Sequence, residues 1–355
     1  MKYPQRISRK ITISNTQIGG GSPILVQSVC SNQPKNLLEI IEEINVLEGI
    51  GCEMIRVMIA DLADVEAISK IKEKIRIPLI GDLLFDEQII LAAINNGIDK
   101  IRLNPGFLSE NSLKNILAKA QEKNIPVRIG INSRAFPPET LKRFGLTARG
   151  LVQATMDSIY RFEKLGFQDI VVSIKSTDLL QTIEANQLFA VQSMYPIHLG
   201  ITQAGTEDSG VVRSSAALGT LLLDGIGDTI RYTLGGNAKR EVLSAHYLLR
   251  GLGLRQGPVV IAGGSSRSSI NIEALALAIE AELASVKLPL KVALIGSDVE
   301  VDEMQHADIG LIGKGNKGYL YLKGKKICEL QAEEILPRLK SEISDFLKSN
   351  TTKTF

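Results

Sequence analysis

Five strand-like segments of this chain each carry one cation where a buried strand is normally apolar. The cations are Arg56 in Met54-Ile55-Arg56-Val57-Met58, Arg102 in Lys100-Ile101-Arg102-Leu103, Arg128 in Val127-Arg128-Ile129-Gly130, Lys175 after Ile170-Val171-Val172-Ser173-Ile174, and Arg231 in Asp228-Thr229-Ile230-Arg231-Tyr232. A charge inside a packed sheet costs several kcal/mol unless an anion meets it. The five cations therefore predict one shared anion. A phosphorylated ligand suits them, because guanidinium groups donate paired bonds to phosphate oxygens.

Polar side chains follow the same strands near the points where the strands end. They are Gln27, Ser28, Asp82, Asn104, Asn132, Thr202, Gln203 and Thr233. Groups at the carboxyl ends of parallel barrel strands converge on one site. We therefore expect Thr202, Gln203 and Thr233 to join the cations around the ligand. The alternative is internal pairing of two or three cations with Asp82, Asp178 or Asp228.

Four titratable residues on or beside these strands are candidates for acid–base catalysis: Asp82, Lys175, His198 and Asp228. A positioned carboxylate, amine or imidazole can transfer a proton in a transition state. A lone strand histidine such as His198 is, however, also typical of a hydrogen-bonded core residue. The three cysteines, Cys30, Cys52 and Cys328, lack metal-ligand spacing, so no metal site is predicted.

The elements that position these residues alternate between short β-rich runs and amphipathic helical patterns. Eight candidate strands lie at 24–29, 54–59, 78–83, 100–104, 127–131, 169–175, 197–202 and 228–234. Helical patterns lie between them, at 37–48, 62–74, 86–95, 112–123 and 155–165. Eight strand–helix units in about 250 residues predict an α/β fold of the TIM-barrel, or (β/α)8, type.

The pattern restarts after Gly257-Pro258. Candidate strands at 259–261, 290–295 and 308–312, a hairpin at 319–328 and helices at 271–286 and 332–347 predict a small α+β domain. We expect a ligand-binding barrel over 1–257, the α+β domain over 258–348 and a tail over 349–355.

Composition excludes several classes of function. The chain has 355 residues, with 41 Lys and Arg against 39 Asp and Glu, and this balance argues against a general nucleic-acid surface. It contains no apolar run of about 18 residues and no apolar leader, so we expect neither a membrane span nor secretion. The cytoplasm is the expected compartment.

Several segments are close to the motifs of one known family. They are 18–28, Ile101-Arg102-Leu103-Asn104-Pro105-Gly106, Pro126-Val127-Arg128-Ile129-Gly130-Ile131-Asn132, His198-Leu199-Gly200-Ile201-Thr202 and 218–231. Together they resemble the hydroxymethylbutenyl diphosphate synthases, the IspG/GcpE family of iron–sulfur enzymes in the methylerythritol phosphate route to isoprenoids. The likeness runs through nearly the whole barrel and is weaker beyond residue 258.

The resemblance implies a barrel that holds methylerythritol cyclodiphosphate and a C-terminal domain that carries a 4Fe–4S cluster. It also implies a homodimer in which the cluster domain of one chain closes over the barrel of the other. The diphosphate-binding set that it implies is Arg56, Arg102, Arg128, Asn132, Lys175, Arg231 and Thr233. This set agrees with the anion site expected from the strands.

The chain departs from the family at its cluster motifs. The family's Cys-Pro-x-Cys-x-Arg is Ala262-Gly263-Gly264-Ser265-Ser266-Arg267 here, and its third cysteine segment is 296–303, which begins Gly296-Ser297. Of the four family ligands, only a glutamate at Glu303 remains as a candidate. Since thiolates hold such clusters, we expect no cofactor.

Two barrel positions differ as well. A polar family residue is replaced by Leu84, and Gln203 stands where the family has a glutamate. An amide cannot transfer protons as a carboxylate does.

These features favour an IspG-like protein that binds methylerythritol cyclodiphosphate or a related small phosphorylated molecule without the family's reductive step. It would be either a repurposed non-redox enzyme or a non-catalytic subunit, as a homodimer or as a heterodimer with a complete relative. The alternative is a hydroxymethylbutenyl diphosphate synthase, active alone or with a complete partner chain.

Overall fold

The computed structural model describes residues 5–83, 86–132, 136, 138–264, 268–297 and 302–351. The chain divides into two compact units, Met1–Leu248 and Leu249–Phe355. The division falls inside the helix α9 (Ala238–Gly251), somewhat before the boundary at 257 expected from the sequence.

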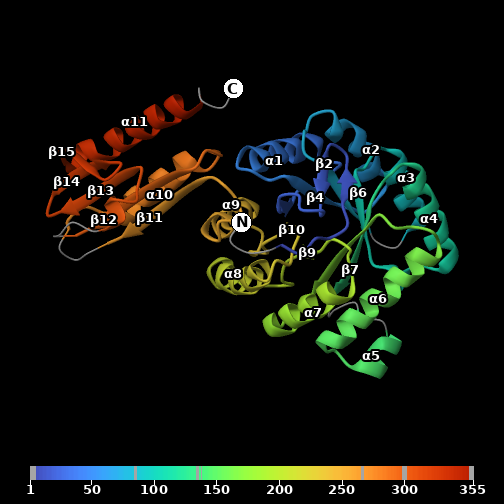
Figure 1. Cartoon of the computed structure of the whole chain (residues 1–355). Coiled ribbons are helices and arrows are strands. Elements are labelled where there is room, and N and C mark those ends of the chain that lie inside the picture. Colours follow the sequence, from blue (N-terminus) through green and yellow to red (C-terminus); the bar gives the residue numbers. More distant parts are fainter. Residues whose placement is uncertain are drawn as a thin grey trace. The chain divides into compact units, whose positions relative to one another are not determined.

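The first unit is a barrel of eight parallel strands surrounded by helices (Figure 1). Its strands are β3 (Leu25–Val29), β4 (Met54–Ile59), β5 (Leu79–Leu83), β6 (Lys100–Leu103), β7 (Val127–Asn132), β8 (Ile170–Lys175), β9 (His198–Leu199) and β10 (Thr229–Ile230). They pair in the order β8-β7-β6-β5-β4-β3-β10-β9. A bridge between Val172 and Ile197 joins the two ends of this sheet. The (β/α)8 fold predicted from the sequence is thus confirmed.

The helices of the first unit follow the strands in sequence. They are α1 (Leu37–Gly49), α2 (Leu62–Lys72), α3 (Glu87–Asn95), the short 3-10 helix η1 (Pro105–Phe107), α4 (Glu110–Glu122), α5 (Pro138–Phe144), α6 (Ala148–Lys164), α7 (Leu179–Gln192), α8 (Glu207–Leu223) and α9. Side chains cap several of them at the N-terminus. Asp86 accepts hydrogen bonds from the backbone N–H groups of Gln88 and Ile89, and this satisfies donors that a helix start leaves without partners. Within the described ranges, no helix is both long and apolar enough to span a membrane.

A hairpin that the sequence analysis did not predict seals the amino end of the barrel. It consists of β1 (Ile11–Ile13) and β2 (Thr16–Ile18), which pair antiparallel. Ile11, Ile13 and Ile18 are buried, and they cluster with residues from the first positions of the strands, such as Leu25 and Met54. The amino end is therefore filled with apolar side chains.

Strand register places the charged residues inside the barrel, above this apolar plug. Alternate residues of a strand share a face, so Arg56 lies on the same inner face as Met54, and Asp82 on the same inner face as Ile80. Arg102 is the register partner of Asp82 on one side and of Arg128 on the other. The inner layer toward the carboxyl ends is consequently polar, whereas barrel interiors are usually filled by apolar branched residues.

The last two barrel strands are much shorter than expected. The sequence predicts strands over 197–202 and 228–234, but β9 and β10 have two residues each. Backbone pairing ends soon after the bond from Arg231 N–H to Leu199 O. The residues that follow belong to loops that face the carboxyl end of the barrel. One of them, Gln203, has a φ of 52°, which turns the chain away from the strand direction.

The described part of the second unit is a mixed five-stranded sheet with two α-helices and one short 3-10 helix. Its elements are β11 (Pro258–Gly263), α10 (Ile272–Leu283), β12 (Leu290–Gly296), the 3-10 helix η2 (Asp302–Met304), β13 (Ile309–Lys314), β14 (Lys317–Leu322), β15 (Lys325–Gln331) and α11 (Ala332–Thr351). Strands β11 to β13 run parallel, and β13 to β15 run antiparallel. Ile279 on α10 and Leu339 on α11 pack into one core with Val292, Leu311 and Leu320 of the sheet. This agrees with the α+β domain expected from the sequence.

Candidate functional site

The predicted anion-binding residues converge on one cavity at the carboxyl ends of the barrel strands. The cavity has a volume of 260 Å³ and is lined by Arg56, Asp82, Arg102, Arg128, Gly130, Ile131, Asn132, Ser173, Lys175, Ile201, Thr202, Gln203, Arg231 and Thr233. All nine residues expected to contact the ligand are in this set, together with Asp82. Since small-molecule sites usually measure about 300–1,000 Å³, the cavity suits a small ligand.

Asp82 is the carboxylate that meets two of the arginines. Its Oδ1 accepts a hydrogen bond from Arg102 Nη1 at 3.0 Å, and its Oδ2 lies 3.4 Å from Arg56 Nη1. Burial raises the pKa of the Asp82 carboxyl, but the charges of Arg56 and Arg102 outweigh burial and leave this pKa below its usual value. Asp82 is therefore ionised at neutral pH. Of the five cations, Arg56 and Arg102 thus show the pairing with Asp82 that was considered as an alternative to anion binding.

Arg231 pairs with a residue that the sequence analysis missed, Glu241 on α9. Arg231 Nε donates to Glu241 Oε2 at 3.2 Å, and Glu241 Oε1 accepts from the backbone N–H of Leu234 at 2.9 Å. The Glu241 side chain is almost completely buried. An acidic residue in the first turn of a helix is common, because it complements the helix dipole. Its sequence position therefore did not mark it as part of the site.

Arg128 and Lys175 have no carboxylate partner among the described residues. Arg128 is 2% exposed, and its Nη1 donates to Gln27 Oε1 at 3.2 Å, while its Nε has no partner in the described part of the chain. Burial, followed by the charge of neighbouring cations, lowers the pKa of both groups well below their usual values. A buried cation that lacks an anion is what an anionic ligand stabilises.

Gly200 leaves the space that the Lys175 amine occupies. A Cβ added at Gly200 would lie 2.5 Å from Lys175 Nζ and 2.9 Å from the backbone O of Arg231. Both distances are too short for a side chain. Gly200 therefore allows the amine to reach the cavity.

Two of the four predicted acid–base candidates do not line the cavity. His198 is fully buried, its Nδ1 lies 2.8 Å from Thr229 Oγ1, and burial followed by the charge of Lys175 lowers its pKa well below the usual value. Asp228 precedes β10 at the amino end of the barrel, where it accepts bonds from Ser8 Oγ and the backbone N–H of Ile197. A catalytic role for His198 and Asp228 stays a prediction, and neither residue is among those that line the cavity. The sequence places both residues on or beside a strand, but it does not show whether their side chains reach the cavity at the carboxyl end of the barrel.

Three further residues expected near the strand ends are placed as follows. Asn104 caps η1 by accepting from Gly106 N–H, and Gln27 and Ser28 are buried but do not line the cavity. Leu84 lies outside the described residues.

The positions equated with cluster ligands fall in the second unit. Ala262 is on β11, Ser297 follows β12, and Glu303 is in η2, whereas residues 265–267 and 298–301 lie outside the described residues. Ala262 and Ser297 offer no thiolate, the usual ligand of an iron–sulfur cluster. Within the described ranges, no three His, Cys, Asp or Glu side chains gather in a metal-binding group.

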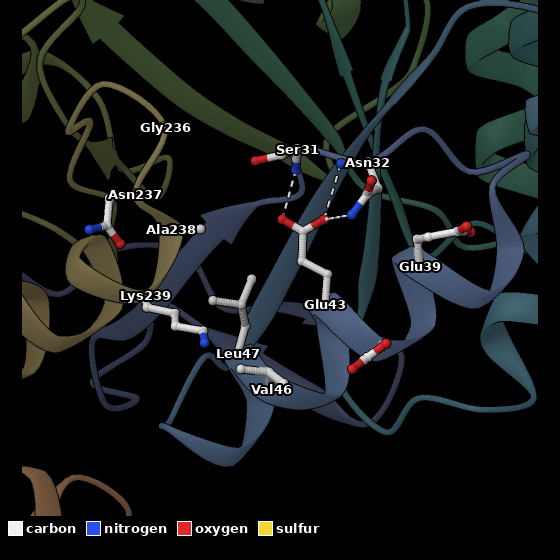
Figure 2. A pocket seen from close by; sticks show the side chains of 11 residues that line it. Ser31, Asn32, Glu39, Glu43, Val46, Leu47, Gly236, Asn237, Ala238 and Lys239 are labelled. Carbon is white, nitrogen blue, oxygen red and sulfur yellow. Dashed lines mark hydrogen bonds between the residues drawn. The ribbon is translucent and has the colours of Figure 1, made fainter.

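A second cavity of 660 Å³ lies between α1 and the start of α9, and Figure 2 shows its lining. Glu43 accepts hydrogen bonds from the backbone N–H groups of Ser31 and Asn32 and from Asn32 Nδ2. Glu39 and Glu42 add two further carboxylates to the wall, with Lys239 as its cation. The acidic lining disfavours a phosphorylated ligand here. The barrel cavity is therefore the candidate site for the anion.

Curated relatives match the chain over nearly its whole length. A protein of Thermotoga petrophila, named 4-hydroxy-3-methylbut-2-en-1-yl diphosphate synthase (flavodoxin), is 40% identical over 342 residues, which cover 96% of this chain and 98% of the relative. A protein of Caldanaerobacter subterraneus subsp. tengcongensis with the same name is 40% identical over 349 residues, which cover 97% of this chain and 98% of the relative.

These relatives contradict one expectation. The missing cysteines predict no cofactor, but the name that the relatives carry is that of a flavodoxin-linked synthase, and their match extends through both units. The prediction of a cofactor-free chain is therefore wrong. It rested on a few positions, whereas the likeness covers nearly every element.

Solved structures share the barrel fold at low sequence identity. Dihydropteroate synthase of Yersinia pestis aligns with a TM-score of 0.52 and 12% identity, covering 70% of this chain and all of that chain. Type I 3-dehydroquinate dehydratase of Clostridium difficile aligns with a TM-score of 0.50 and 17% identity, covering 70% of this chain and 98% of that chain. At such identities these matches show the fold alone.

Family models cover both units. The model described as the GcpE TIM-barrel domain matches residues 8–246, and the model described as the GcpE protein C-terminal domain matches residues 260–345. These matches, together with relatives at 40% identity, agree with the resemblance seen in the barrel motifs. The chain belongs to the GcpE family.

Proposed function

We propose that this chain acts in the formation of 4-hydroxy-3-methylbut-2-enyl diphosphate in the methylerythritol phosphate pathway, with methylerythritol cyclodiphosphate as the substrate held in the barrel. The observation that carries the proposal is the cavity itself. Four arginines and Lys175 line it, and Asp82 is the one carboxylate among its described lining residues. A small ligand with two negatively charged phosphates matches both the charge and the volume of this cavity.

The lining residues divide into charge partners and hydrogen-bond partners. Arg56, Arg102, Arg128, Lys175 and Arg231 bind the diphosphate oxygens, and each charge-assisted bond contributes about 1.5–3 kcal/mol. The polar side chains of the rim, Asn132, Thr202, Gln203 and Thr233, orient the rest of the molecule. Asp82 and Lys175 are the two predicted proton carriers that reach the cavity, while the Gln203 amide positions the ligand without titrating.

Flavodoxin, the carrier in the relatives' name, is the electron donor that we propose. A 4Fe–4S cluster, on this chain or on a complete partner chain, supplies one-electron chemistry when bound. The assembly that we propose is a dimer, of two copies or with a complete relative. The cytoplasmic location expected from the sequence stays a prediction.

Calorimetric titration with methylerythritol cyclodiphosphate tests the binding part. We expect micromolar or tighter binding by the natural chain and its loss in Arg128→Ala, because Arg128 is buried in the cavity wall. Arg76→Ala is the matched control, since Arg76 is an exposed arginine whose side chain is 93% accessible. If the folded natural chain does not bind the cyclodiphosphate, the proposed substrate is wrong.

Turnover is tested with anaerobically reconstituted protein and reduced flavodoxin. About four irons per chain would place a cluster on this chain. In a second reaction, the chain is mixed with a complete synthase that carries Ala in place of its own equivalent of Arg128. Product in this mixture would mean that the substrate binds in the barrel of the present chain and that its partner supplies the electrons. A lack of product in both reactions would overturn the catalytic part of the proposal.

A further inference from the structure

The described barrel interior holds more cations than its carboxylates can balance. Asp82 faces Arg56 and Arg102, and Glu241 faces Arg231. Arg128, Lys175 and the deeper Lys100 have no carboxylate partner among the described residues. Like charges in a poorly solvated interior repel strongly. A guanidinium group cannot relieve this repulsion by losing a proton, whereas an amine can.

Lys175 is the amine at the cavity surface, and charged or titratable groups from the other barrel strands surround it. They are Arg128 on β7, Arg102 on β6, Asp82 on β5, Arg56 on β4, His198 on β9 and Arg231 after β10. The one carboxylate among them, Asp82, is already held by two arginines. No hydrogen bond joins Lys175 Nζ to a described residue. Burial and the four arginines accordingly lower the pKa of Lys175 well below its usual value.

We propose that the barrel binds its diphosphate together with one proton, which passes from solvent to the amine of Lys175. This inference rests on the proposed function and concerns the same cavity. In the empty barrel the amine is neutral, because a further charge would add to that of four arginines. A diphosphate in the cavity places acceptor oxygens beside Nζ and cancels part of the arginine charge. The ammonium form then becomes the stable one.

Lys100 provides a matched comparison within the same interior. It lies on the inner face of β6, two residues before Arg102, and it is completely buried. The polar atom in reach of its Nζ is the Met54 sulfur, 4.0 Å away. Lys100 does not line the cavity. Since burial is the largest cause of its lowered pKa, a ligand that cannot touch the amine leaves Lys100 neutral.

Proton uptake fixes the direction in which ligand affinity changes with pH. When binding takes up a proton, affinity falls as pH rises between the pKa of Lys175 in the empty barrel and its pKa in the complex. Over that interval the dissociation constant rises about tenfold per pH unit, and below it the constant is independent of pH. The ligand itself adds no proton uptake or release near neutral pH. Each phosphorus of a cyclic diphosphate carries one strongly acidic hydroxyl, which is already ionised at neutral pH.

The experiment is calorimetric titration with methylerythritol cyclodiphosphate at one mildly alkaline pH in two buffers with different ionisation enthalpies. The dependence of the observed heat on the buffer gives the number of protons taken up. We expect about one proton for the natural chain and for Lys100→Met. We expect none for Lys175→Met, whose side chain has a similar length and no titratable group. A melting curve for each variant verifies that it is folded.

Each outcome decides between the two proposals. Binding by the natural chain without proton uptake overturns this inference and leaves the proposed function intact. If proton uptake is lost in Lys100→Met but kept in Lys175→Met, the proton goes to Lys100, and this result also overturns the inference. No binding at all by the folded natural chain overturns the proposed substrate and the inference together. If Lys175→Met does not fold, the buffer dependence and the pH dependence of the natural chain still decide whether a proton is taken up.

Discussion

The guanidinium group of Arg102 packs directly against the backbone of Gly130 on the neighbouring strand. A Cβ added at Gly130 would lie 2.7 Å from Arg102 Nε and 3.1 Å from its Nη2. Arg102 also donates to Asp82 at 3.0 Å, so its side chain is held between a carboxylate and a glycine. The glycine in Val127-Arg128-Ile129-Gly130 thus supplies space for a cation of the adjacent strand.

Gly130→Ala is expected to displace the Arg102 guanidinium and to break its bond to Asp82. One lost charge-assisted bond to the ligand is worth about 1.5–3 kcal/mol, so affinity for the cyclodiphosphate should fall at least about tenfold. Calorimetry measures this fall. Gly219→Ala is the control, because Gly219 is in helix α8 and an added methyl group there meets its nearest atom only at 3.7 Å. Unchanged affinity in Gly130→Ala would contradict the assigned role of Arg102.

Removal of the Glu241 carboxylate should destabilise the barrel. In Glu241→Ala, Arg231 has no anion and the N–H of Leu234 has no acceptor, so we expect a loss of about 3–5 kcal/mol in the free energy of unfolding. Glu241→Gln keeps an oxygen for Leu234 N–H and should lose clearly less. Urea unfolding of the two variants measures the difference. Equal losses would show that the amide oxygen does not replace the carboxylate at Leu234.

Asp82 should contribute to stability in a way that depends on pH. Its folded-state pKa lies below the usual value, so its contribution is present above about pH 4 and is lost as pH falls through the folded-state pKa. We therefore expect the free energy of unfolding of the natural chain to decline more steeply below about pH 4 than that of Asp82→Asn. Urea titrations over the acidic range measure both curves. Parallel curves would mean that Asp82 is not held by the arginines.

The amino-terminal hairpin should stabilise the barrel through its buried isoleucines. Ile13 is completely buried in the cluster that closes the amino end, and truncation of such a residue typically costs about 2–5 kcal/mol. Ile13→Ala should therefore lower the midpoint of urea unfolding. Thr12→Ala, at the exposed position between Ile11 and Ile13, should change it little. Similar midpoints for the two variants would show that the hairpin is not part of the barrel core.

Strand periodicity and charge were sufficient to predict the barrel and the set of cations that lines one of its cavities. One cation in each of five otherwise apolar strands, such as Arg56 and Arg128, indicated an inward face with an anion, and the cavity contains all five. Alternation is a local property of a strand, so it can be read from neighbouring residues. The hairpin β1–β2 was missed because its strands have only three residues each.

Tertiary structure alone decided which charges meet. Arg231 and Glu241 pair across ten residues of loop and helix, and Asp82 meets Arg102 through the register of two strands. It also separated Lys175, which reaches the cavity, from Asp228, which lies at the opposite end of the barrel and accepts a bond from Ser8. Residue type determines what a side chain can bind. Which partner it has, and whether that partner leaves an amine unpaired, depends on contacts between segments far apart in the sequence.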